Sequence, residues 1–340
     1  MANIKIFNKL REFYRKRKKA INLTLRLIIS LSLIIYLIFS QFKDFQTIVS
    51  TLKDINIPLI ILSALTHVYG IWITAFRLQA LLKTQNVYLP ISFLSASTVV
   101  GMFFNNFLPT TVGGDIYRGY DVTKRSGFPL SSSISVIVVE RFSGIVASGV
   151  FAIAALFLGF TTIGGQSIVI PIVIVVILIV LVFFLILNPN VLGLEKLAKR
   201  FKPIAKLLEK LQNVYTTLLS FKKFKLVLAK VMFYSFTLQF SVILNYWLAS
   251  KSLGIDLSLV SFIFIVPVVT IIAMLPISLG GIGLREGSVV LLMVALGAPS
   301  EKATMCSLLL FAMLIVLSII GGIIYGLRPF LAKKERERVL

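Results

Sequence analysis

The sequence predicts an all-α polytopic membrane protein, and three observations lead to this fold class. The 340-residue chain is 58% hydrophobic, and its mean hydropathy is +0.97. Several apolar runs approach or exceed the roughly 20 residues that a helix needs to cross a bilayer. The run between Ser167 and Leu187 is continuously apolar, whereas the strands of a membrane β-barrel alternate polar and apolar residues. We therefore expect membrane-spanning helices.

About eight apolar segments are long enough to be transmembrane helices. The first follows a basic stretch and has no convincing small-residue cleavage site after it, so we expect an uncleaved helix rather than a removed signal peptide. A shorter apolar piece lies at 284–297. The expected helices cover residues 23–39, 57–76, 90–107, 131–158, 168–187, 226–249, 257–275 and 303–326.

Three basic blocks predict the orientation of these helices. The first 22 residues contain eight Lys or Arg, residues 188–225 contain nine, and the tail after Gly326 contains five. The links expected on the outer side, at 40–56, 159–167, 250–256 and 297–302, carry two, none, one and one. Because loops rich in Lys and Arg stay in the cytoplasm, we expect a multi-pass cell-membrane protein whose two termini are both cytoplasmic.

The same blocks divide the chain into domains. We expect a basic N-terminus at 1–22, a transmembrane domain at 23–328 and a basic tail at 329–340. Residues 188–225 carry apolar side chains at helical spacing among lysines, which predicts an amphipathic helix on the inner leaflet. This helix is either a solvated connector or an element that recognises lipid. The net charge of +22 gathers at the ends of apolar runs, which favours anionic inner-leaflet lipids over nucleic acid as partners.

Metal and redox chemistry are disfavoured by the residue counts. Cys306 is the single cysteine, which excludes an intramolecular disulfide and a CxxC pair. His67 is the single histidine, which excludes a site built from several histidines. We therefore expect no metal and no cofactor. His67 itself is either a proton relay or a hydrogen-bonded histidine in a packed bundle.

The run "LPTTVGGDIYRGY" at 108–120 interrupts the apolar pattern. If the helices before and after it both start on the cytoplasmic side, residues 108–125 must return to that side within about eighteen residues. Non-helical backbone is tolerated at membrane depth only where protein or a water-filled cavity satisfies its amides. We expect a re-entrant or broken segment that lines a cavity.

Residues 275–285, "LPISLGGIGLR", repeat the pattern of residues 108–118, "LPTTVGGDIYR". Both fit Leu-Pro-x3-Gly-Gly-x3-Arg. The offset that aligns the two motifs also aligns the predicted helices that precede them. The predicted orientation makes the two copies run oppositely, so we expect an inverted repeat with halves at about 57–160 and 224–327. In transporters of this kind, paired Gly/Pro-interrupted segments meet near the membrane midplane and present broken helix ends to the substrate.

Residue types in the two interruptions predict their roles. A helix N-terminus followed by an arginine suits a phosphate group, so Arg118 and Arg285 are predicted headgroup ligands. Asp115 and Glu286 lie beside them to pair with an arginine or to meet a positive group. The alternatives are tight helix packing for the glycines and interfacial anchoring for the arginines. The residues expected to break the helices are Pro109, Gly113, Gly114, Pro276, Gly280, Gly281 and Gly283.

Glu140 and Arg141 lie inside an otherwise apolar run. A charge at the centre of a membrane helix costs roughly 2.5–3.5 kcal/mol on insertion scales, so such residues usually face a partner or a cavity. Both are therefore site candidates, and a structural ion pair with Asp115 or Arg118 is the alternative.

Two further polar residues receive lesser roles. Asn106 can hydrogen-bond between helices and can also reach a headgroup. Arg77 falls at the cytoplasmic end of its predicted helix, where we expect its side chain to snorkel toward the interface.

Three motifs in order carry a resemblance: "NNFLPTTVGGDIYRG", "VERFSG" and "LPISLGGIGLREG". Together they resemble the flippase-like transmembrane region of lysylphosphatidylglycerol synthases and its stand-alone relatives, over about residues 23–328. In the full synthases this region is thought to move an aminoacylated phospholipid between leaflets, while a separate soluble domain makes that lipid. The resemblance places polar motif positions on Asn106, Pro109, Gly114, Asp115, Arg118, Glu140, Arg141, Gly281, Gly283, Arg285 and Glu286.

The resemblance implies a lipid flippase rather than an enzyme. About fourteen residues follow the last predicted helix, so we expect no synthase domain, and relatives of this type have been linked to polyprenyl-linked sugars as well as phospholipids. No P-loop is present, so movement would be downhill or coupled to ions or voltage. A lipid-synthesising enzyme or a glycosyltransferase is a possible partner.

Two alternative functions stay open. One is a membrane-embedded transferase that uses a polyprenyl-phosphate-linked donor, although its usual acidic pair in the first outer loop is not evident between Asp44 and Asp54. The other is a non-transporting scaffold for a partner enzyme.

Overall fold

The computed structural model describes most of the chain between residues 55 and 339. Several sequence predictions lie outside the described residues: the helix at 23–39, most of 168–187, most of the 188–225 connection, and the positions Pro109, Pro276 and Gly280. The described residues are 32, 55–107, 113–160, 162–163, 166–167, 169–170, 173–174, 177, 221, 223–273, 278 and 281–339.

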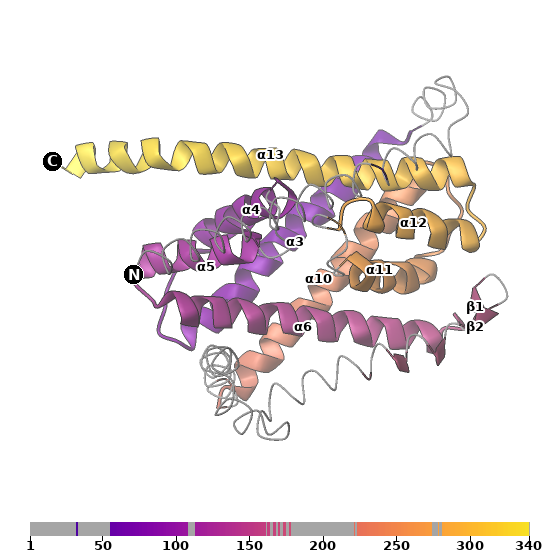
Figure 1. Cartoon of the computed structure of the whole chain (residues 1–340), viewed down its shortest axis with the longest axis horizontal. Coiled ribbons are helices and arrows are strands. Elements are labelled where there is room, and N and C mark those ends of the chain that lie inside the picture. Colours follow the sequence, from indigo (N-terminus) through magenta and orange to yellow (C-terminus); the bar gives the residue numbers. More distant parts are fainter. Residues whose placement is uncertain are drawn as a thin grey trace, which may run out of the picture.

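The described residues form eight helices, and the predicted all-α class is confirmed (Figure 1). A two-residue antiparallel pair, β1 (Thr162–Ile163) and β2 (Gln166–Ser167), follows α6. The helices are α3 (Ile57–Lys83), α4 (Ile91–Phe107), α5 (Gly113–Ser126), α6 (Leu130–Phe157), α10 (Lys225–Ser252), α11 (Leu259–Ala273), α12 (Leu284–Ala295) and α13 (Ser300–Val339).

Four described helices are long and apolar enough to cross a membrane: α3, α6, α10 and the part of α13 from Ser300 to Arg328. In contrast, α4 has 17 residues and α11 has 15. At 1.5 Å per residue these two helices are about 25 and 22 Å long, which is less than the roughly 30 Å hydrocarbon core. The predicted polytopic membrane protein thus combines full spans with shorter helices.

Helices α4 and α5 form an antiparallel hairpin across the predicted interruption. At its closed end, the backbone N–H of Gly114 donates to Oδ1 of Asn105 at 2.8 Å. Near its open end, the guanidinium of Arg125 lies 6.0 Å from the ring centre of Phe93. Helix α5 therefore returns to the level at which α4 begins, as the predicted return of residues 108–125 requires.

The second half of the chain repeats the order of the first. The offset that aligns the two motifs lays α3 to α6 on α10 to α13. The equivalent helices α3 and α10 run antiparallel, because Ser63 hydroxyl donates to the Asn245 carbonyl and Ser241 hydroxyl donates to the Thr66 carbonyl. These are the relations that an inverted repeat produces.

Packing between the halves is reciprocal. Helix α13 packs on α4, and its equivalent α6 packs on α11. In Figure 1, α13 and α6 lie along opposite sides of the molecule, with α3 and α10 crossing between them. Two apolar clusters fill the interior: one includes Leu78, Leu81 and Leu94, and the other includes Phe262 and Ile265.

The contact between α13 and α4 depends on a glycine. A Cβ atom at Gly321 would lie 2.2 Å from the carbonyl oxygen of Val99, which is backbone and cannot rotate away. Its neighbour Gly322 faces the ring of Phe103, where a Cβ atom would lie 3.0 Å from ring carbons. Small residues that let two backbones approach closely are a common device of helix packing in membranes.

Replacing Gly321 with alanine should therefore destabilise the protein by about 1–3 kcal/mol, the usual range for overpacking. The matched control is Gly326→Ala on the same helix, where nothing lies within 4 Å of the added Cβ. The measurement is the unfolding transition of both purified variants in detergent. Equal stabilities for the two variants would contradict the close contact of α13 with α4.

Candidate functional site

A buried carboxylate, Glu140, joins two arginines from other helices. It lies about one third of the way along α6, and its side chain is 1% exposed. Oε1 accepts a hydrogen bond from Nη2 of Arg77 at 3.0 Å, and Oε2 accepts one from Nη2 of Arg118 at 2.9 Å. Both arginines are themselves buried. One carboxylate thus connects α3, α5 and α6.

The predicted snorkelling of Arg77 is wrong. Helix α3 continues to Lys83 rather than ending at residue 76, so Arg77 lies about 9 Å inside the helix end. Its Nη1 also donates to Ser235 hydroxyl of α10 at 3.2 Å, and Ser235 hydroxyl lies 2.9 Å from that of Ser143. Lys83, which is exposed, takes the terminal position instead. This second basic residue was the signal in the sequence that the helix runs past Arg77.

Asp115 and Arg141 extend this group toward the surface. Nε of Arg141 is ion-paired with Oδ2 of Asp115, and Nη1 of Arg118 lies 3.7 Å from Oδ1 of the same carboxylate. The Arg141 side chain is 40% exposed, the most exposed of the group. Three arginines and two carboxylates give this cluster, hereafter the Glu140 cluster, a formal charge of +1. The structural ion pairs that were the alternative for Glu140 and Arg141 are present.

Glycines bring Arg118 to the cluster. A Cβ atom at Gly114 would lie 2.1 Å from the carbonyl oxygen of Gly101, and one at Gly101 would lie 3.1 Å from Cγ and Cδ of Arg118. Gly113 and Gly114 are the first two residues of α5. Because Gly114 has no side chain, the backbone of α5 can lie close to that of α4. Nearby, Nδ2 of Asn106 donates to the hydroxyl of Ser318 on α13 at 2.6 Å.

The second interruption is built differently. Gly281 and Gly283 have φ angles of +80° and +84°, which glycine adopts without strain, and α12 begins directly after them. Glu286, 1% exposed, accepts the backbone N–H of Gly283 on Oε2 at 2.6 Å. Its Oε1 accepts Nε and Nη2 of Arg285 at 2.9 and 2.5 Å. Ser307 of α13 donates to the Glu286 carbonyl at 3.1 Å.

Arg285 borders a cavity of about 230 Å³ at the crossing of α3 and α10. We call this space the Arg285 cavity. Met102 of α4 also reaches it, so both halves of the chain contribute to its wall. Its polar lining consists of Thr66, His67, Thr74, Ser241, Asn245, Tyr246 and Arg285.

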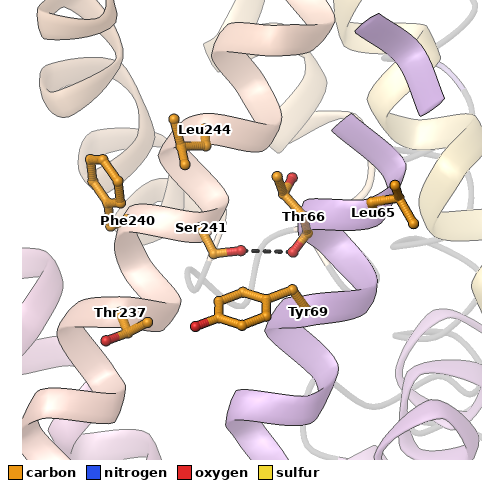
Figure 2. Close-up of a pocket in the computed structure, with 7 residues that line it drawn as sticks. All are labelled: Leu65, Thr66, Tyr69, Thr237, Phe240, Ser241 and Leu244. Carbon is orange, nitrogen blue, oxygen red and sulfur yellow. Dashed lines mark hydrogen bonds between the residues drawn. The ribbon is translucent and has the colours of Figure 1, made fainter. Parts of the chain in front are cut away.

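A second cavity, of about 320 Å³, lies at the same crossing and is lined mainly by apolar groups. Figure 2 shows Tyr69 and Phe240 on two facing helices, which the hydrogen bond from the Ser241 hydroxyl to the Thr66 carbonyl joins. Thr66 and Ser241 line both cavities. Its remaining lining residues are Leu65, Thr237 and Leu244.

The two predicted headgroup arginines belong to separate groups. In the part of the chain that the structure describes, no hydrogen bond or ion pair joins the Glu140 cluster to Arg285 or Glu286. Arg77 of the cluster and His67 of the Arg285 cavity lie ten residues apart on α3, which is about 15 Å along the helix axis. Within the same described residues, no group of three His, Cys, Asp or Glu side chains is placed to hold a metal ion.

Removing the charge of Glu140 should destabilise the fold, because two buried arginines lose their counter-ion. We expect Glu140→Gln to cost about 3–5 kcal/mol, as for other broken buried ion pairs. The control is Glu301→Gln at the exposed start of α13, which should cost at most about 1 kcal/mol. Unfolding of both variants in mixed micelles measures the difference.

A double variant, Arg77→Gln with Glu140→Gln, measures the free energy with which these two residues stabilise each other. Its loss should be smaller than the sum of the two single losses, because the partners act on each other. Additive losses would show that Arg77 and Glu140 do not stabilise one another.

Comparison with known proteins agrees with this architecture. The chain matches the family described as the lysylphosphatidylglycerol synthase TM region over residues 23–322, which contains α3 to α12 and the start of α13. It is also 26% identical over 322 residues to the UPF0104 membrane protein PH1989 of Pyrococcus horikoshii, an alignment that covers 88% of this chain and 95% of that protein. These matches confirm the resemblance seen in the three motifs: the chain is a membrane protein that belongs to the lysylphosphatidylglycerol synthase transmembrane-region family.

Proposed function

We propose that this chain is a flippase, which moves a lipid with a phosphate-bearing headgroup between the two leaflets of a membrane. The lipid is a phospholipid or a polyprenyl-phosphate-linked molecule. The observation that carries the proposal is the Arg285 cavity, where a guanidinium borders a space between two membrane-spanning helices. A cavity that has an arginine and several other polar side chains in its wall gives a headgroup a route that the hydrocarbon core does not offer.

The cost of burying charge supports this proposal. Each Arg or carboxylate at the centre of a membrane helix costs roughly 2.5–3.5 kcal/mol on insertion scales, and such residues often mark substrate pathways. The proposed headgroup ligand is Arg285 at the cavity, which Glu286 holds by an ion pair. Arg118, Asp115, Glu140 and Arg141 hold α3, α5 and α6 together as the Glu140 cluster, and Asn106 joins α4 to α13. No catalysis is needed for this role.

The arrangement of helices supports a moving transporter. In transporters with inverted repeats, one repeat rocks against the other around a fixed site. Here the hairpin of α4 and α5 packs against α13 from the other half, and α11 packs against α6. The family description, which names a synthase of a modified phospholipid, supports a lipid as the substrate.

Charge supports an orientation in the cell membrane. We propose cytoplasmic termini, because the basic blocks at 1–22, 188–225 and after Gly326 would all lie there. These blocks would bind anionic lipids of the inner leaflet. An enzyme that makes the transported lipid, or a glycosyltransferase, would act beside the chain.

Lipid transfer by the purified chain is the direct test. Vesicles that contain the chain and a fluorescent phosphatidylglycerol in both leaflets should lose fluorescence from both leaflets when an impermeant reductant is added outside. Protein-free vesicles protect the dye of the inner leaflet and serve as the control. The flippase proposal fails if vesicles with the folded protein protect that dye equally well.

A cross-link tests whether the halves must move. Asn106 and Ser318 have side-chain atoms 2.6 Å apart across α4 and α13, so cysteines at these positions, with Cys306→Ala, should form a disulfide on oxidation. We expect oxidation to stop lipid transfer and reduction to restore it, because the disulfide ties the first hairpin to the second half. The two single-cysteine variants, oxidised in the same way, are the controls. Unchanged transfer after complete cross-linking would rule out movement between α4 and α13.

A further inference from the structure

The two halves differ in chemistry at equivalent positions, although their helices correspond. Arg118 of the first half is equivalent to Arg285 of the second under the motif offset. The same offset places Ser307 where the first half has Glu140, and Leu244 where it has Arg77. The second half therefore lacks both the carboxylate and the additional arginine of the Glu140 cluster.

In the first half, Arg118 is buried between two carboxylates; within the described residues its Nη2 is hydrogen-bonded, whereas its Nε has no hydrogen-bond partner. Its Nη2 donates to both oxygens of Glu140, at 3.2 and 2.9 Å, and its Nη1 lies 3.7 Å from Asp115. The whole residue is 6% exposed. An anion that bound Arg118 would have to displace a buried carboxylate, which would then lose its counter-ion.

In the second half, donors around the cavity are still available. Arg285 uses Nε and Nη2 for Glu286, and within the described residues its Nη1 makes no hydrogen bond. His67 and Tyr246 also line the cavity, and neither is hydrogen-bonded to any part of the chain that the structure describes. Both oxygens of Glu286 are occupied by Arg285 and Gly283. The space thus offers three donors, while its neighbouring carboxylate is already paired.

We infer that the Arg285 cavity binds a single phosphate group through Arg285, His67 and Tyr246, whereas the equivalent Glu140 cluster is a structural ion group that binds no ligand. An oxyanion matches this set of donors, and a planar guanidinium is well suited to phosphate. A cavity of about 230 Å³ holds a headgroup and leaves the hydrocarbon chains in the bilayer. That this phosphate belongs to a lipid rests on the proposed function.

The first experiment measures binding to the full-length purified chain by native mass spectrometry. Phosphatidylglycerol and a polyprenyl phosphate should both bind, whereas diacylglycerol, which has no phosphate, should bind at least about tenfold more weakly. Competition with inorganic phosphate distinguishes a lipid headgroup from a free phosphate ion as the ligand. If inorganic phosphate displaces both lipids, the cavity is a site for the phosphate ion. If it displaces neither lipid, the cavity is a site for the lipid headgroup. Equal binding of diacylglycerol would overturn the inference.

Variants then test the individual donors. Arg285→Gln should weaken phosphatidylglycerol binding by about tenfold or more, the effect of losing a charge-assisted hydrogen bond. His67→Gln should weaken it by about two- to tenfold. Lys251→Gln removes the same charge from a side chain that pairs with exposed Asp256, and it should leave binding within about twofold. Wild-type affinity in folded Arg285→Gln protein would overturn the assignment.

A carboxylate placed in the second half tests the difference between the halves. Ser307→Glu places a carboxylate at the position that is equivalent to Glu140. The control is Ser307→Gln, whose side chain has nearly the same size and no charge. We expect Ser307→Glu to bind phosphatidylglycerol about tenfold or more weakly than Ser307→Gln. Equal binding by the two variants, with equal unfolding temperatures, would show that the missing carboxylate does not matter.

The binding and transfer assays separate this inference from the proposed function. Lipid transfer by the wild type together with full binding by Arg285→Gln would overturn the cavity assignment and leave the flippase proposal standing. Arg285-dependent binding by a wild-type chain that transfers no lipid would support the cavity assignment and reject the flippase.

Discussion

A carboxylate buried between membrane helices must be matched by positive charge, and Glu140 meets this requirement with arginines from two other helices. These ion pairs join three helices, because Glu140 lies on α6, Arg77 on α3 and Arg118 on α5. Through Ser235, Arg77 also reaches α10. A low-dielectric interior makes such pairing strong and makes its absence costly. The positions of three helices of the first half, α3, α5 and α6, and of α10 in the second half are therefore tied to one buried carboxylate.

The short hairpin of α4 and α5 solves a second problem of the membrane, which is how to bury a broken helix. The open backbone amide of Gly114 is satisfied by Asn105, and the absence of a side chain at Gly114 lets α5 lie against α4 at Gly101. The second break uses other means, since positive φ angles at Gly281 and Gly283 redirect the chain and Glu286 caps the new helix. The two similar motifs thus begin a new helix with different local interactions.

The repeated architecture and the differing chemistry have separate roles. Antiparallel packing of α3 on α10 needs small and polar residues at the crossing, and Ser63, Thr66 and Ser241 supply hydrogen bonds there. The charged groups do not take part in this contact, and the two halves carry different charged residues at equivalent positions. One half has a closed ion cluster, while the other has an arginine beside a cavity. A flippase needs both a stable frame and an accessible headgroup site, and this division would supply them.

The fold class, most helix positions and the two interruptions could be predicted from the sequence, because apolar run length and Gly/Pro placement are local properties of a chain. The sequence also indicated Glu140 as a charge that needs a partner. One partner, Arg118, was among the alternatives that the sequence offered. The other, Arg77, could be found only from the tertiary structure, because it lies 63 residues away on a helix that continues past the predicted end. The tertiary structure also decided that Arg118 and Arg285 belong to different groups and that His67 shares a cavity with Arg285. Pairing of this kind depends on how helices cross, and hydropathy along a chain carries no record of which helix faces lie against each other.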